Sequence, residues 1–186
     1  MQVLEKKKEE VEAKANKMSD FVKMEYLESC LKTIPDLSVA KYCYKQLAEL
    51  YEKKLMYTEA SKYMTRFGES CVGAKEKIAA IIKEAELLIK AGQYDPAGYL
   101  YTKAMTLADA SGKFEIKRNM ILTYKKEAEL LEKSNRSTAA LKIYEKIINY
   151  VLDAEKIEMK RKMLKLYQNL GRITDYLKLK SELEKI

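Results

Sequence analysis

Apolar residues recur at mixed intervals of three and four along most of this chain. The clearest stretch is 80–108, where two such runs flank the short segment AGQYDP at 91–96. Intervals of three and four place apolar side chains on one face of an α-helix, so this stretch predicts two helices joined by a turn. Strand-like alternation is nearly absent, and the 186 residues include only 6 Gly and 2 Pro. The pattern therefore predicts an all-α protein.

The same helix–turn–helix pattern returns along the chain without an intervening linker. Residues 1–35 form a mainly helical N-terminal segment that would cap the array, and Pro35 ends it because proline lacks an amide hydrogen. Ser111 and Gly112 are expected to connect the second hairpin to the third. Four helical hairpins are predicted, at about 37–71, 74–111, 114–152 and 155–186. A chain of this length can bury a sizeable core as one compact array.

Turn residues predict where the helices end and begin. Gly92 and Asn135 suit the left-handed residue that closes a helix, and Gly171 holds the same place in the fourth hairpin. Asp95 and Pro96 suit the N-cap and the first position of the next helix. The other predicted N-caps are Ser19, Thr58, Ser137 or Thr138, and Thr174.

The hairpins share a register. Ala60, Ala97 and Ala140 begin the second helices at intervals of 37 and 43 residues, and Tyr176 follows 36 residues later. A small residue lets two helices approach closely, so each hairpin buries its apolar face only against its neighbours. The same register aligns three further sets: Ala48, Ala85 and Ala128; Leu50, Leu87, Leu130 and Leu166; and Met64, Tyr101 and Tyr144.

One hairpin carries a small–Gly–Tyr–Ala–aromatic–Ala pattern at Ala85, Gly92, Tyr94, Ala97, Tyr101 and Ala104. This pattern resembles the tetratricopeptide repeat (TPR), and the resemblance covers about residues 38–186. It implies a right-handed superhelical array of antiparallel helical hairpins, a TPR-like α-solenoid. The chain departs from the family in having no tryptophan, and its spacings exceed the usual length of about 34 residues.

Residues that commonly perform catalysis are missing. The chain has no histidine and no Gly-rich phosphate loop, which removes the commonest general base and metal ligand. Glu84 and Glu86 do not form a carboxylate pair, because residues two apart on a helix point in different directions. Cys30, Cys43 and Cys71 fit no metal-site spacing and are interpreted as reduced thiols. We expect no enzymatic activity, no cofactor and no metal.

The formal net charge is +8, with Lys and Arg spread among many acidic residues. This excess is compatible with an acidic peptide, a nucleic acid or a membrane surface as partner, and equally with a solvated Lys- and Glu-rich surface. No apolar run is long enough for a transmembrane segment, and the first residues do not resemble a signal peptide. A cytoplasmic location is therefore expected.

In the TPR family, first helices line a concave groove that binds peptides, so the resemblance implies an adaptor or scaffold for a protein or peptide partner. Lys45 and Lys126 match basic clamp positions of the family, but Glu49 and Lys83 replace asparagines of that clamp. The alternatives are a basic nucleic-acid-binding helical repeat protein and a self-assembling structural subunit. The candidate partner-binding residues are Tyr42, Lys45, Lys83, Tyr94, Tyr99, Lys126, Arg161 and Lys165.

Overall fold

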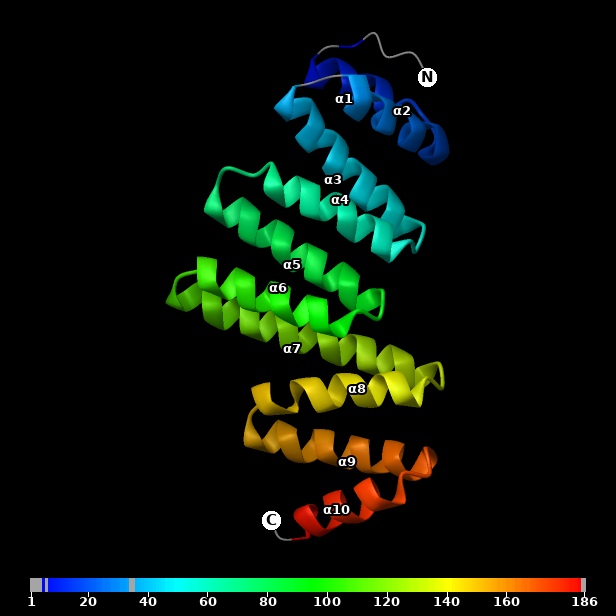
Figure 1. Cartoon of the computed structure of the whole chain (residues 1–186), viewed down its shortest axis with the longest axis vertical. Helices are drawn as coiled ribbons and strands as arrows, with labels where there is room; N and C mark the ends of the chain where they lie inside the picture. The colour runs from blue at the N-terminus through cyan, green and yellow to red at the C-terminus, as the bar shows by residue number, and fades with distance from the viewer. Residues whose placement is uncertain (1–4, 6, 34–35, 185–186) are drawn as a thin grey trace. The chain divides into compact units, whose positions relative to one another are not determined.

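A computed structural model describes residues 5, 7–33 and 36–184 of the chain (Figure 1). The prediction that Pro35 ends the N-terminal segment lies outside these residues. Within them the secondary structure is helical, with no strand. The helices are α1 (Lys8–Ala15), α2 (Asp20–Thr33), α3 (Leu37–Lys53), α4 (Tyr57–Glu69), α5 (Ala74–Lys90), α6 (Tyr94–Leu107), α7 (Ala110–Lys133), α8 (Ser137–Ile147), the short 3₁₀ segment η1 (Ile148–Tyr150), α9 (Asp153–Asn169) and α10 (Ile173–Leu183).

The chain forms two compact units, Met1–Lys113 and Phe114–Ile186. In the first unit α3, α4, α5 and α6 pack in chain order, each antiparallel to the next (Figure 1). In the second unit α8, α9 and α10 pack in the same manner. The predicted all-α architecture of antiparallel hairpins is therefore confirmed. The division into a cap and four hairpins stays a prediction.

The small residues of the predicted register are buried. All six alanines of the two aligned sets are at most 1% exposed, and Tyr101 and Tyr144 are equally buried. The register fails at Leu130, which is 59% exposed. Helix α7 instead buries Tyr124, Ala128 and Leu131, and Leu130 points about 100° away from its neighbour Leu131.

Helices α1 and α2 each bury one apolar face against α3. Val11 and Tyr26 lie in one core cluster with Val39 and Leu47. Asp36 caps α3, because its carboxylate accepts a hydrogen bond of 2.9 Å from the amide of Val39. The N-terminal segment therefore shares a core with the first hairpin.

The closing residues of the first helices adopt left-handed geometry, as predicted. Gly92, Asn135 and Gly171 have φ of 77°, 56° and 67°. The equivalent residue of the first hairpin is Leu55, with φ of 60°. No sequence signal pointed to a leucine in this conformation.

The predicted N-caps of four second helices are wrong. Helices α4, α6, α8 and α10 begin one to two residues earlier than expected, so Thr58, Asp95, Thr138 and Thr174 lie inside them and Ser137 is already helical. The first helical hydrogen bond of each helix is accepted by a backbone carbonyl. In α4, for example, the carbonyl of Met56 accepts from the amide of Ala60. None of these four helices has a side-chain cap at its N-cap residue.

The connection predicted at Ser111 and Gly112 is also wrong. Helix α7 already begins at Ala110 and runs through both residues. Asp109 explains this early start, since its carboxylate accepts from the amide of Gly112 at 2.7 Å and its carbonyl accepts from the amide of Lys113. At the N-terminal segment, Ser19 does precede α2, and its carbonyl accepts from the amide of Lys23.

Candidate partner-binding surfaces

Ion pairs join the first helices of the first unit. Lys41 of α3 lies 2.6 Å from Glu76 of α5, and Glu52 of α3 receives Lys83 at 2.8 Å and Lys90 at 2.7 Å. Burial alone would raise the pKa of Glu52, but the hydrogen bonds from the two lysines outweigh it and lower this pKa. Glu52 is therefore ionised at neutral pH and holds α5 against α3.

The second unit repeats this arrangement. Lys125 of α7 lies 3.1 Å from Glu155 of α9, and Lys162 of α9 lies 3.4 Å from Glu129 of α7. Glu155 is the third residue of its helix, as Glu76 is of α5, and Lys162 is the tenth, as Lys83 is of α5. We call the surface of α7 and α9 that bears these two ion pairs the second-unit face.

A small cavity of about 60 Å³ opens on the second-unit face. The ammonium group of Lys162 lies 6.0 Å from the ring centroid of Tyr144, whose hydroxyl donates to Glu132. Small-molecule sites usually enclose about 300–1,000 Å³, so this cavity is too small to bury a cofactor. Its lining residues are Lys125, Glu129, Tyr144, Glu155, Glu158, Met159 and Lys162.

The predicted basic residues fall into two groups. Lys83 is neutralised by Glu52. Lys45, Lys126, Arg161 and Lys165 are exposed, and none of these four makes an ion pair with another residue that the structure describes.

Sequence reasoning missed the paired lysines of the second-unit face, Lys125 and Lys162. Their register offered a signal, because the dipeptide Lys125-Lys126 precedes Arg161-Lys162 by 36 residues. That interval is the spacing between the third and fourth hairpins.

The candidate tyrosines differ in exposure. Tyr99 is 70% exposed, whereas Tyr42 and Tyr94 are half-buried. Tyr42 packs against the core of α1–α3, and its buried hydroxyl has no hydrogen-bond partner among the described residues. Of the three, Tyr99 offers the largest accessible aromatic surface.

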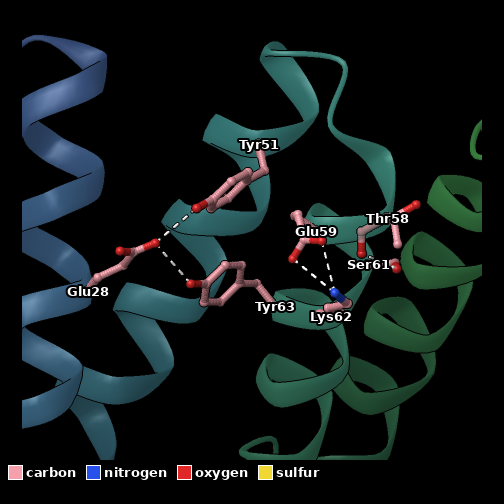
Figure 2. A network of polar contacts seen from close by, with 7 residues as sticks. All are labelled: Glu28, Tyr51, Thr58, Glu59, Ser61, Lys62 and Tyr63. Carbon is pink, nitrogen blue, oxygen red and sulfur yellow. Dashed lines mark hydrogen bonds and ion pairs between the residues drawn. The ribbon is translucent and has the colours of Figure 1, made fainter.

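A carboxylate binds two tyrosine hydroxyls within the first unit (Figure 2). Tyr51 of α3 and Tyr63 of α4 donate to Glu28 of α2 at 2.9 and 3.1 Å, and their rings stack with centroids 5.3 Å apart. Tyr63 is partly buried against the core of this unit. Its hydroxyl connects the first hairpin to α2.

The described residues show no cluster of His, Cys, Asp and Glu that could hold a metal ion. Cys30, Cys43 and Cys71 are free and buried, and burial raises the pKa of the Cys43 thiol to about 12. Such a thiol is a poor nucleophile at neutral pH. In the part of the chain that the structure describes, every helix is too short or too polar to cross a bilayer.

Glu84 of α5 lies between α4 and α5, where its carboxylate accepts a hydrogen bond of 2.8 Å from Thr65. Burial raises the pKa of Glu84 above its usual value of 4.5, and the Thr65 hydrogen bond offsets part of this rise. The folded state thus binds this proton more tightly than the unfolded state does. The free energy of unfolding therefore falls as the pH rises above 4.5. We expect Glu84→Gln to raise the free energy of unfolding at pH 7, with a gain that shrinks towards pH 4.

Urea unfolding at pH 4 and pH 7 measures this difference. Glu9→Gln is the matched control, since Glu9 is exposed and should show little change at either pH. A lower stability of Glu84→Gln at pH 7 would contradict the argument.

No protein-family model and no curated protein matches the chain. Among solved structures, the chain is similar to a protein of Podosopora anserina described as a kinesin light chain candidate with nearly identical TPR-like repeats. The two share 14% identity with a TM-score of 0.40, and the match covers 95% of this chain and 91% of that one. A variant of that protein gives the same values. BtubC (BKLC) from P. vanneervenii is similar at 10% identity and a TM-score of 0.41, over 94% of this chain and 76% of that one.

The fold itself identifies the architecture. Antiparallel hairpins bury alanines at equivalent positions, and their first helices close on left-handed residues. These are the features on which the sequence resemblance rested. The chain has a TPR-like helical-repeat fold.

Proposed function

We propose that this chain is a non-enzymatic adaptor that binds an acidic segment of a protein partner on the second-unit face. The observation that carries the proposal is the set of exposed cations Lys126, Arg161 and Lys165, which form no ion pair within the described residues. Lys126 lies one helical turn from Glu129, and Lys165 lies one turn from Lys162, so both border the face.

The charges already on this face support an anionic partner. Lys125 and Lys162 are paired with Glu155 and Glu129, so binding need not disturb them. The unpaired cations supply the surplus charge that would attract carboxylates. Complementary charge raises the association rate and selects the partner, while apolar contacts contribute affinity.

The test is a triple charge reversal, Lys126→Glu, Arg161→Glu and Lys165→Glu. The probe is a capped peptide of alternating Glu and Leu, followed by fluorescence anisotropy at about 50 mM salt. Each exposed ion pair contributes about 0.2–1 kcal/mol, so we expect the triple variant to bind about tenfold more weakly.

The matched control is Lys117→Glu, Lys142→Glu and Lys178→Glu, which changes the net charge equally at exposed positions outside the proposed set. An equal loss in both variants would show that only net charge matters and would contradict the proposal. If a 20-nucleotide RNA instead binds with steep salt dependence and only the first variant loses it, the nucleic-acid alternative replaces the adaptor.

A further inference from the structure

The turn between α3 and α4 contains a leucine where the other hairpins have none. Leu55 adopts φ of 60° and is 70% exposed, whereas its equivalents are Gly92, Asn135 and Gly171. Left-handed geometry strains an ordinary side chain, a cost that glycine avoids and asparagine partly offsets by local hydrogen bonds. The turn therefore does not require leucine, and the fold gains little from an exposed side chain.

The neighbouring residue is also apolar and exposed. Met56 is 46% exposed, and its equivalents in the other hairpins are Gln93, Arg136 and Arg172. Phe21 of α2, which is 64% exposed, borders the same turn, because the ammonium group of Lys54 lies 5.4 Å from its ring centroid. We call Phe21, Leu55 and Met56 the Leu55 corner.

A shallow cavity of about 290 Å³, largely open to solvent, lies beside Leu55 and Met56, within the first unit. Because it is open, it suits a side chain packed against its floor rather than an enclosed cofactor. Its lining residues are Leu55, Met56, Tyr57, Thr58, Glu59 and Ala91.

Charges around the corner favour a moderately acidic partner. Lys53 pairs with Asp20 at 2.5 Å, and Lys54 makes no ion pair with the residues that the structure describes. Glu59 lies in the cavity wall and pairs with Lys62 at 2.9 Å. The interleaved carboxylates would repel a dense anionic surface such as a lipid headgroup layer, but a short peptide can place one of its own carboxylates beside Lys54.

We propose that the Leu55 corner docks a segment of a partner protein in which one or two bulky apolar side chains are flanked by carboxylates. An apolar side chain of the partner packs into the cavity beside Leu55 and Met56, and a carboxylate of the partner faces Lys54. The site belongs to the first unit and is independent of the second-unit face.

The experiment selects random dodecapeptides displayed on phage against the full chain, with counter-selection against the double variant Leu55→Gly and Met56→Gln. These substitutions copy Gly92 and Gln93 of the second hairpin. We expect an acidic, apolar consensus peptide that binds the double variant at least tenfold more weakly. The thermal midpoint of the double variant should be unchanged or higher, because glycine removes the left-handed strain.

Two control variants test whether binding is specific to the Leu55 corner. Val72→Ser removes a side chain that is 93% exposed in the α4–α5 connection and should leave binding unchanged. The triple charge reversal of the second-unit face should also leave it unchanged, so failure of one proposal does not imply failure of the other.

Two results would overturn the proposal. These are a selection that yields no peptide able to distinguish the two folded chains, and a consensus without carboxylates. If the chain binds vesicles of phosphatidylserine and phosphatidylcholine and the double variant does not bind them, the Leu55 corner docks on a membrane surface and not on a peptide.

Discussion

Tyr101→Ala should lower the free energy of unfolding of the first unit by about 3–5 kcal/mol, as for other large-to-small aromatic changes in protein cores. Tyr101 is fully buried in α6, at the position that Met64 and Tyr144 occupy in other hairpins. Because its ring is fully enclosed, alanine would leave a cavity that neighbouring helices cannot close without moving. Urea unfolding followed by circular dichroism measures the loss.

Tyr99→Ala is the matched control. It removes the same side chain two residues away on the same helix, but Tyr99 is 70% exposed. Surface substitutions usually change stability by less than about 0.5 kcal/mol. Equal destabilisation by the two substitutions would mean that the register of α6 differs from the one described.

Gly68→Leu should destabilise the first unit by about 1–2 kcal/mol. Gly68 is buried in α4, and a Cβ atom there would lie 3.3 Å from the Cβ of Ala80 in α5. That contact is already tight, so a leucine must push the helices apart, and overpacking of this kind costs about 1–3 kcal/mol. The higher helix propensity of leucine offsets up to about 1 kcal/mol of this cost.

The measurement is the unfolding midpoint of a graded series at this position. Gly68→Ala should have a smaller effect than Gly68→Leu, because a single methyl group needs only a small shift of Ala80. Gly73→Ala is the control, since no heavy atom lies within 4 Å of a Cβ built there. A stabilised Gly68→Leu variant would contradict the close approach of α4 and α5.

Packing could be predicted from the sequence because it depends on residues that recur in register. The buried alanines and Tyr101 follow from helical periodicity and from the spacing between hairpins. The helix starts could not be predicted to the residue, because the backbone of Met56 begins α4 without any side-chain cap. Local capping preferences were therefore misleading at Thr58.

The candidate sites were harder to predict because their chemistry depends on contacts between helices. Lys83 looked available in the sequence, but Glu52 lies 31 residues earlier and neutralises it. A charge pattern along one helix does not reveal a partner on the next. Leu55 was missed for another reason, since an exposed leucine is ordinary until its backbone conformation is known.

The ion pairs between first helices have a practical consequence for protein engineering. Glu76 and Glu155 each stand in the first turn of a first helix and meet a lysine of the preceding one, while Lys83 and Lys162 complete the exchange in the opposite direction. These contacts connect two successive first helices within each unit. A designed hairpin placed after α3 or after α7 would keep both ion pairs if its first helix had an acidic third residue and a basic tenth residue.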